Sequence, residues 1–244
     1  MIYIGIDDTD NREGGGTGRV ARAIADVLRH DWPVVGVSRH QLLVDPRVPY
    51  TSNNSCNVIH LAPEAPERVD RLALALHVQP LLLDRCLPGS DPGLCVGGSE
   101  LAGHPFGTEV QQEVVTQSRA LSLAESLGVF LRPLGGTGDG VVGALAGVIL
   151  AASGNDGRFV ERGRSREADG ILTVTELLVG GIDGVRTREG LPVVEGLVDT
   201  CGRVRPVLEG HRAVLLVEPG EAGMWRVVEL GKPKHPREEV PCTP

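Results

Sequence analysis

The chain opens with MIYIGIDDTDNREGGGTGRV (residues 1–20), a short apolar run that continues directly into acidic residues and then glycines. Residues 1–6 have the character of a buried strand, and a helical pattern follows the glycines. The carboxylates of Asp7, Asp8 and Asp10 stand at the end of this strand, where burial is costly unless a cation lies beside them. The stretch therefore predicts a strand, a loop and a helix, with charged groups gathered at the junction.

The glycines after the acids predict a loop whose bare backbone N–H groups face an anion at the start of a helix. Carboxylates beside such a loop are typical of a polyphosphate bound together with Mg²⁺. The alternative is a tight strand-to-helix turn with solvated acids, one of which caps the turn. The glycines of this loop are Gly14, Gly15, Gly16 and Gly18.

Two further expectations concern the side chains of this junction. Alternation along a strand would point Asp8 and Asp10 to one side and Asp7 to the other, leaving a pair suited to one Mg²⁺. The hydroxyl of Thr17 could cap a helix that begins at Gly18, contact Mg²⁺ or phosphate, or accept a phosphoryl group. Its position favours the capping role.

A second glycine-rich loop, LGGTGDG at residues 134–140, repeats this arrangement. It leads into residues 141–152, which are apolar nearly all round and predict a buried helix. Gly136 and Gly138 are expected to bind phosphate through backbone N–H groups, and Asp139 stands where a metal or ribose contact would lie. Two such junctions predict one nucleotide site lined by both loops.

Weaker candidates for substrate contact come from other loops. Asn54 belongs to a polar cluster entering a strand, which suits either contacts to a base or sugar or the chemistry of a turn. His104 lies in the loop of residues 103–107 and is a candidate substrate contact. His60 alternates with apolar neighbours and is expected to be structural.

Composition limits the function classes. The 244 residues include 41% hydrophobic and 23% charged side chains, and the net charge of −8 argues against a wide electrostatic grip on nucleic acid. The net charge does not exclude a local basic groove. Such a groove would have to use arginine, because the two lysines, Lys232 and Lys234, lie near the end of the sequence. The absence of a long apolar run, a signal-peptide pattern and C-x-x-C spacing predicts a reduced cytoplasmic protein without a membrane partner. An oligomer is left open.

The pattern along the chain predicts a mixed α+β fold. It indicates one long helix over residues 109–127 and a glycine- and proline-rich loop over residues 88–106. Beyond residue 155 the texture changes to short β-like runs. We expect a nucleotide-binding domain over residues 1–155, a smaller β-rich or ferredoxin-like module over residues 156–235 and a tail over residues 236–244.

Several motifs together resemble the archaeal tRNA-isoleucine agmatidine synthetases. The shared features are Ile-Asp-Asp-Thr-Asp at residues 6–10, Gly-Thr at residues 16–17, Pro-Arg-Val-Pro-Tyr-Thr at residues 46–51 with Asn54, which is similar to the family's Pro-x-x-Pro-aromatic-x-Thr, and Gly-Val-Val-Gly-Ala-Leu-Ala at residues 140–146. The first and last of these are specific when found together in this order. The resemblance covers residues 1–155 clearly and the remainder weakly.

The resemblance implies a kinase-like α/β domain with a ferredoxin-like module, and a site that uses ATP and Mg²⁺. In that family ATP phosphorylates a cytidine carbonyl oxygen in tRNA, and agmatine then displaces the phosphate. By this analogy Asp7, Asp8 and Asp10 hold the metal, and Thr17 matches a threonine that becomes phosphorylated. The family continues into a tRNA-binding barrel and a zinc ribbon, for which this chain shows no matching cysteine spacing.

These observations lead to three hypotheses. The first is an ATP- and Mg²⁺-dependent phosphotransferase or ligase that activates a carbonyl oxygen of a small molecule or nucleotide for attack by an amine. The second is a tRNA cytidine-modifying enzyme that works with a separate tRNA-binding partner. The third is a non-catalytic nucleotide-binding regulator.

Overall fold

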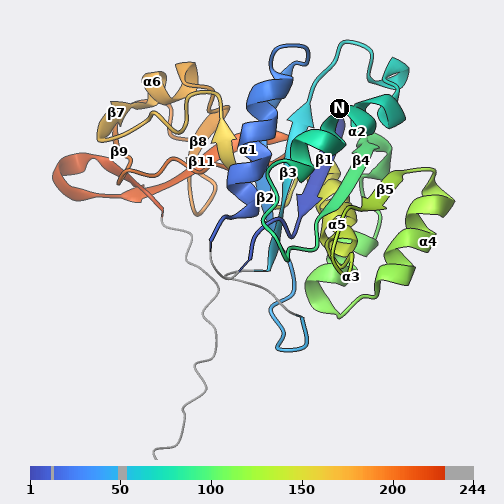
Figure 1. The fold of residues 1–244 in the computed structure, drawn as a ribbon. Helices are drawn as coiled ribbons and strands as arrows, with labels where there is room; N and C mark the ends of the chain where they lie inside the picture. Colours follow the sequence, from blue (N-terminus) through green and yellow to red (C-terminus); the bar gives the residue numbers. More distant parts are fainter. Residues whose placement is uncertain (12–13, 49–53, 229–244) are drawn as a thin grey trace, which may run out of the picture.

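The computed structural model describes residues 1–11, 14–48 and 54–228, and these residues form one mixed α+β unit around a 12-stranded sheet. The sheet runs through the molecule between two layers of helices (Figure 1). Its first half has the strand order β5-β4-β1-β3-β2-β6, and every neighbouring pair there is antiparallel. These strands are β1 (Ile2–Asp7), β2 (Val34–Gln41), β3 (Ser55–Leu61), β4 (Gly93–Gly98), β5 (Phe130–Pro133) and β6 (Arg158–Arg162).

Helices cover both faces of this half of the sheet. The helices α1 (Thr17–Leu28) and α2 (Arg71–Leu83) pack on one face, over a core that includes Ile4 and Ile59. The helices α3 (Phe106–Gln112), α4 (Gln117–Leu127) and α5 (Gly140–Ser153) form the opposite layer, with α5 directly against the strands. Short 3-10 turns lie at Pro66–Arg68, Ser99–Leu101 and Glu221–Gly223.

Helix α5 approaches the sheet so closely that glycine is required on both sides. A Cβ on Gly93 of β4 would lie 2.2 Å from the carbonyl of Gly140, and a Cβ on Gly5 of β1 would lie 2.2 Å from the carbonyl of Ala144. Real side chains do not tolerate such distances, so the small residues of α5 let its backbone rest on β1 and β4. This contact confirms the predicted buried helix and brings the start of α5 to the end of β1.

The second half of the sheet continues from β6 and encloses a separate core. It runs β6-β10-β11-β12-β9-β7, and β8 pairs in parallel with β11. Val174, Val198 and Val217 belong to its core, which is distinct from the two cores of the first half. The elements are β7 (Ile171–Thr173), α6 (Val174–Val179), β8 (Gly184–Thr187), β9 (Leu197–Asp199), β10 (Val207–Glu209), β11 (Arg212–Pro219) and β12 (Trp225–Val227).

The boundary expected at residue 155 stays a prediction. Strand β6 lies beyond that point in the chain, yet it pairs with β2 of the first half. It also contacts β10 through the pairing of Arg158 with Val207. Strand β6 is therefore the element through which the two halves share one sheet. The expected tail lies outside the described residues.

Three expectations about secondary structure are wrong, each for a local reason. The predicted loop of residues 88–106 contains β4, whose glycines serve the close packing of α5 rather than a turn. The predicted long helix is two helices, because Glu113 adopts an extended conformation and Thr116 caps α4 by accepting from the N–H of Arg119. Residues 173–178, one of the runs beyond residue 155 expected to be β-like, are largely helix α6, which Thr173 and Glu176 start with a reciprocal capping box.

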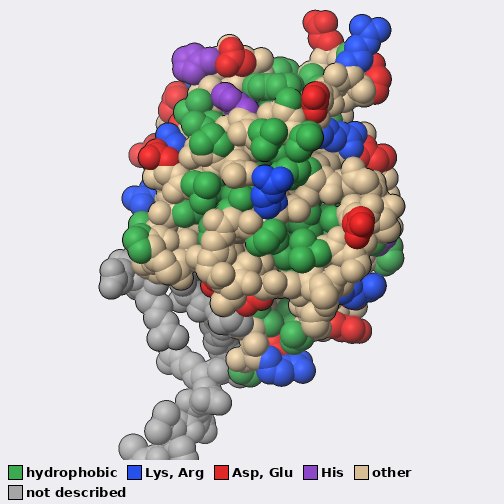
Figure 2. Space-filling model, turned by 45° about the vertical axis from the view of Figure 1, so that its right-hand side comes forward, with side chains coloured by type: hydrophobic (Ala, Val, Ile, Leu, Met, Phe, Trp, Pro, Cys, Tyr) green, Lys and Arg blue, Asp and Glu red, His purple; other side chains and the backbone are tan. Residues whose placement is uncertain are grey.

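The face that carries β5 and α4 has groups of hydrophobic side chains with a basic side chain among them (Figure 2). Exposed leucines on this side of the fold include Leu121 and Leu127 of α4. Scattered apolar residues are normal on protein surfaces, so this face carries no functional assignment. Among the described residues, no helix combines the length and apolar character that a membrane span would need.

Candidate functional site

A cavity of about 480 Å³ lies at the end of the sheet where β1 stops and where α1 and α5 begin. Its volume is within the range of small-molecule sites. Acidic, basic and apolar side chains occupy different parts of its wall. The lining includes Asp7, Asp8, Asp10, Gly15, Gly16, Thr17, Gly18, Arg22, Arg39, Asn54, Asn57, Val114, Val115, Asp139, Gly140, Gly143 and Arg205.

The three acids of the opening stretch all reach this cavity, although not by alternation along a strand. Strand β1 ends at Asp7, and Asp8 has a φ of 53°, so the expectation that Asp8 and Asp10 share one side of a strand is wrong. A left-handed conformation at a residue other than glycine costs about 1–3 kcal/mol and is often found at functional sites.

Burial and crowding of negative charge disfavour ionisation of these acids. Burial, followed by the charges of Asp8 and Asp10, raises the pKa of Asp7 to about 8. Burial, followed by the charges of Asp91, Asp10 and Asp139, raises the pKa of Asp8 to about 6. A bound cation would reverse both effects by favouring the carboxylate forms.

Gly143 on α5 leaves room for the carboxylate of Asp7. A Cβ at this position would lie 1.8 Å from Asp7 Oδ2. The second glycine of the GVVGALA run, Gly143, therefore lets the helix pass beside the partly buried carboxylate of Asp7. The same helix that packs on β1 thus forms one side of the acidic end of the cavity.

The first glycine loop delivers the start of α1 to the cavity. Gly16 is the residue before the helix, with a φ of 125° that only glycine adopts readily, and Thr17 is the first helical residue. The hydroxyl of Thr17 does not cap the helix, so that expectation is wrong; it accepts from the hydroxyl and, weakly, from the N–H of Thr9, at 3.3 and 3.5 Å. The backbone N–H groups of Thr17 and Gly18 have no acceptor among the described residues. They are the donors that the start of a helix can offer to an anion.

The second glycine loop is held by protein groups instead. Asp91 accepts from the N–H of Thr137 through its side chain and from the N–H of Gly140 through its backbone carbonyl. Gln117 donates to Asp139 Oδ1 at 2.7 Å and to the carbonyl of Thr137 at 2.7 Å. Asp139 and Gly140 reach the cavity, whereas Gly136 and Gly138 are not part of its lining.

The remaining predicted residues divide between the cavity and other places. Asn54 lines the cavity, and its Nδ2 donates to the carbonyl of Leu43 at 2.8 Å. His104 lies outside the lining, and its Nδ1 accepts from the N–H of Phe106 at the start of α3. Gly14 is also outside, in a backbone pairing with Asn11. Pro49, Tyr50 and Thr51 of the segment at residues 46–51 lie outside the described residues.

The site contains an amide oxygen without a partner. Asn57 is 2% exposed and lines the cavity, and its Oδ1 has no hydrogen-bond donor among the described residues. A buried acceptor left unpaired costs about 1–3 kcal/mol. A ligand that offers an N–H or O–H group to Asn57 would satisfy it.

The described residues contain no group of three or more His, Cys, Asp or Glu side chains arranged to hold a metal ion by themselves. A Mg²⁺ site does not require such a group. Mg²⁺ usually takes one or two carboxylates and completes its shell with water and substrate phosphates.

Sequence reasoning missed several residues of this site. Asp91 became visible only in three dimensions, because its contact with Thr137 spans 46 residues of the chain. Val114 and Val115 line the cavity because they lie in the extended segment that separates α3 from α4. A signal that could have been used was the β-branched pair followed by Thr116, a typical helix start.

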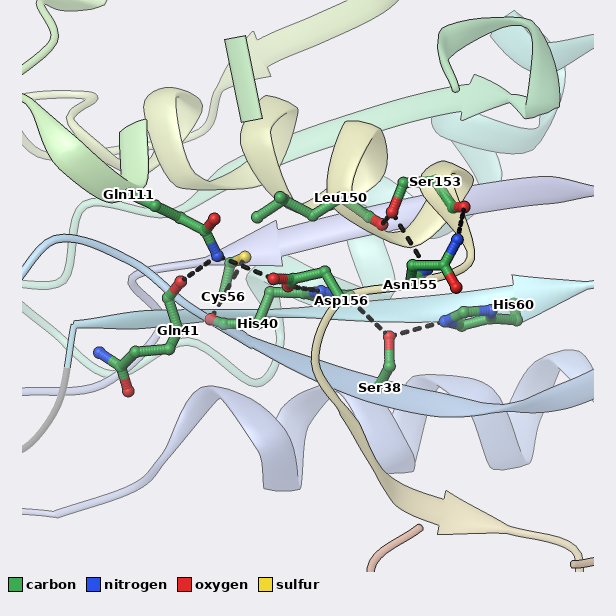
Figure 3. A network of polar contacts seen from close by, with 10 residues as sticks. All are labelled: Ser38, His40, Gln41, Cys56, His60, Gln111, Leu150, Ser153, Asn155 and Asp156. Carbon is green, nitrogen blue, oxygen red and sulfur yellow. Dashed lines mark hydrogen bonds and ion pairs between the residues drawn. The ribbon is translucent and has the colours of Figure 1, made fainter. Parts of the chain in front are cut away.

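A second polar cluster resembles a catalytic triad in its distances but not in its setting (Figure 3). His40 lies between Ser38 Oγ, 2.7 Å from its Nε2, and Asp156 Oδ1, 2.8 Å from its Nδ1. Ser38 and His40 are fully buried, and His60 also contacts Ser38 Oγ at 2.6 Å. Burial and the charge of His40 lower the pKa of His60 to about 3, so this ring is neutral at pH 7. The cluster ties β2 and β3 to the loop after α5, which confirms a structural role for His60.

Comparisons with known proteins give a likeness of fold. A scan against models of protein families found no match, and a search of curated proteins found none. Solved structures similar to this chain include a "tRNA fluorescent labeling enzyme" (23% identity, TM-score 0.52), TiaS with tRNA(Ile2) and ATP (24%, 0.52), and TiaS with tRNA(Ile2), AMPCPP and agmatine (23%, 0.51). TiaS is described as the tRNA(Ile2) agmatidine synthetase.

Each of these three matches covers 60% of this chain and 35% of the other chain, so the chain spans about a third of the proteins it matches. The comparison establishes that this mixed α+β chain resembles the core of TiaS in fold. The resemblance expected from the opening motif and the GVVGALA run is thereby confirmed at the level of structure. At this identity the likeness shows the fold alone.

Proposed function

We propose that the protein binds ATP with Mg²⁺ and transfers a phosphoryl group to a carbonyl oxygen of a nucleotide or small molecule, which an amine then attacks. The observation that carries this proposal is the meeting of three acids with the open start of α1 in one cavity. The solved complexes of TiaS with ATP and with AMPCPP and agmatine add support from a protein of similar fold.

The donors at the start of α1 define the proposed position of the phosphates. Thr17 and Gly18 offer backbone N–H groups that have no acceptor among the described residues. The partial positive charge at a helix start adds to these donors and favours an anion. In this proposal the first glycine loop binds the phosphates, and the second glycine loop positions Asp139.

The acids define the proposed position of the metal. Asp8 and Asp10 lie beside the loop, and Asp7 is held against Gly143. One or two of these carboxylates would hold Mg²⁺, and its charge would favour the ionised forms of Asp7 and Asp8, which burial and then the neighbouring acids disfavour. It would also stabilise charge on the transferred group.

The acceptor would lie where its carbonyl oxygen can reach the terminal phosphate. A bond from this oxygen to phosphorus forms while the bond from phosphorus to ADP breaks, which turns the oxygen into a leaving group. An amine then attacks the activated carbon and phosphate departs. Asn57 and Asn54, on the wall of the same cavity, are proposed to orient the acceptor.

Calorimetric titration with a non-hydrolysable ATP analogue and Mg²⁺ tests this proposal. We expect binding by the wild-type protein and a loss of at least about tenfold in affinity for Asp8→Asn, because a charged metal ligand is removed. Asp31→Asn, which changes an exposed acid just beyond the other end of α1, is the matched control and should bind normally. Absence of binding by the folded wild type, or equal affinity of Asp8→Asn, would overturn the proposal.

Turnover separates the enzyme from a nucleotide-binding regulator. Phosphate release from ATP is measured with cytidine monophosphate or a short cytidine-containing RNA, with and without agmatine as the amine. Release that depends on acceptor and amine supports the transfer reaction. Binding of ATP without release for any acceptor points to the regulator.

A further inference from the structure

An arginine cluster adjoins the cavity, and one of its members, Arg22, lies beside the start of α1, where a Cβ on Gly18 would be 3.7 Å from its guanidinium. It consists of Arg22, Arg39, Arg158, Arg166, Arg203 and Arg205, and three of these, Arg22, Arg39 and Arg205, line the cavity itself. This concentration of cations stands out in a chain with a net charge of −8.

The sheet register explains how part of the cluster forms. Ile6 of β1 pairs with Asn57 of β3, Asn57 pairs with Arg39 of β2, and Arg39 pairs with Arg158 of β6. Paired residues on adjacent strands lie about 5 Å apart and point to the same face of the sheet. One row across the sheet therefore runs from the end of β1, through the unpartnered Asn57, to two arginines.

The other members come from three separate elements. Arg22 lies on α1, Arg166 lies in the turn after β6, and Arg203 and Arg205 lie between β9 and β10. Loops of the second half of the sheet thus bring cations to a cavity built mainly by the first half.

Several arginines of the cluster lack a carboxylate partner within the part of the chain that the structure describes. Among the described residues, Arg166, Arg203 and Arg205 have no carboxylate partner, and Arg39 donates to Ser55 Oγ at 2.8 Å rather than to an acid. Arg22 approaches Glu161 at 3.9 Å, and Glu161 also pairs with Arg29. Burial first, and then neighbouring arginines, lower the pKa values of Arg39 and Arg205.

We infer that the arginine cluster is the binding site for phosphate groups of the acceptor substrate. Guanidinium groups bind phosphate oxygens in pairs, and several of them spread over neighbouring elements match a ligand with more than one charge or phosphate. The cavity then has two ends of opposite charge, with Mg²⁺ and the triphosphate at the acids and the acceptor's phosphates at the arginines. The inference rests on the proposed function for the position of Mg²⁺ and the triphosphate at the acids. The position of phosphate groups at the arginines does not depend on it.

The test uses two probes that carry the same phosphate chemistry. Fluorescence anisotropy follows a labelled single-stranded RNA of about 12 nucleotides, and unlabelled cytidine monophosphate competes with it, over a range of salt concentrations. We expect RNA binding that weakens with salt. Competition by the mononucleotide at equal nucleotide concentration identifies a phosphorylated small molecule, and its absence identifies an RNA strand.

The decisive variant reverses the charge of two arginines of the cluster that do not line the cavity. Arg166→Glu with Arg203→Glu changes two exposed residues outside the cavity lining, so the fold should be retained. We expect affinity for the probes to fall at least tenfold and the salt slope for RNA to fall by about 1–2. Arg68→Glu, an exposed arginine in the Pro66–Arg68 turn that follows β3, is the matched control and should bind as the wild type does.

The affinity for Mg²⁺ and the ATP analogue, measured on the same variants, separates the two claims. Unchanged nucleotide affinity with lost probe binding supports two distinct ends. Loss of both together, wild-type probe binding by the double variant, or no probe binding by the wild type would overturn the inference. Probe binding by a wild type that does not bind ATP would keep the phosphate-binding site at the arginine cluster but remove the proposed function, and with it the ligand's role as acceptor.

Discussion

The two glycine-rich junctions of this chain look alike in sequence but differ in what their backbone groups do. At the first, the N–H groups of Thr17 and Gly18 have no acceptor among the described residues and stand at the cavity. At the second, Asp91 accepts from the N–H groups of Thr137 and Gly140. We therefore place the proposed anion site at the first junction, where the first two N–H groups of the helix are unused, rather than at the second, where the first helical N–H group, that of Gly140, is bound.

The largest difference between the two junctions is expected in the free energy of unfolding, when a glycine in the helix after each junction is replaced by alanine. Gly143→Ala would place Cβ 1.8 Å from Asp7 Oδ2 on a buried helix, and it should lower the free energy of unfolding by about 3 kcal/mol. Gly18→Ala meets Asn57 Oδ1 at 3.2 Å on a partly exposed helix, so its effect on stability should be within about 1 kcal/mol. Denaturant unfolding of both variants measures the contrast, which would break down if Gly18→Ala were the more destabilising.

Asp7, which lies between the two junctions, should make stability depend on pH. Its pKa is raised from 3.8 to about 8, by burial first and then by the charges of Asp8 and Asp10, so the folded state holds this proton more tightly than the unfolded state. The free energy of unfolding should therefore fall as the pH rises from the unfolded pKa of 3.8 to the folded pKa of about 8. Between about pH 6.5 and pH 8 the fall should be about 1–2 kcal/mol.

Thermal unfolding across this pH range, with Asp7→Asn as the comparison, measures the effect. The variant should show a flatter profile, and Mg²⁺ with the ATP analogue should stabilise the wild type more at the higher pH. The range avoids the opposite contribution of His60, whose lowered pKa of about 3 affects stability at lower pH. Parallel profiles for wild type and variant would show that Asp7 does not carry a raised pKa.

The glycines of the two loops are expected to separate the junctions by ligand affinity rather than by stability. Gly16→Ala and Gly138→Ala each replace a glycine with positive φ, 125° and 82°, and each should lower the free energy of unfolding by about 1–3 kcal/mol; Gly138→Ala should cost more, because its Cβ would lie 2.9 Å from Pro133 Cβ. Gly16→Ala should also weaken binding of the ATP analogue at least about tenfold, because the donors of Thr17 and Gly18 move. Calorimetry that finds the larger loss in Gly138→Ala would reverse the assignment.

Local features of the sequence were sufficient to predict both loops, the buried helix α5 and the acids at the end of β1. They were insufficient wherever a role depends on a distant partner. Asp91 closes the second loop across 46 residues, and the arginine cluster gathers positions from Arg22 to Arg205 through strand pairing and loops. Strand β4 was missed because glycine in a sequence usually predicts a turn. Here Gly93 instead allows close packing of the strand against Gly140.

The most direct test of the account compares the backbone amides of the two junctions while ligand is added. Amide chemical shifts of the ¹⁵N-labelled protein are followed during titration with Mg²⁺ and a non-hydrolysable ATP analogue. The account predicts the largest shifts at Thr17 and Gly18, with smaller shifts at Thr137 and Gly140, whose N–H groups are already bound to Asp91. Largest shifts at Thr137 and Gly140, or none at Thr17 and Gly18 when ligand is bound, would contradict it.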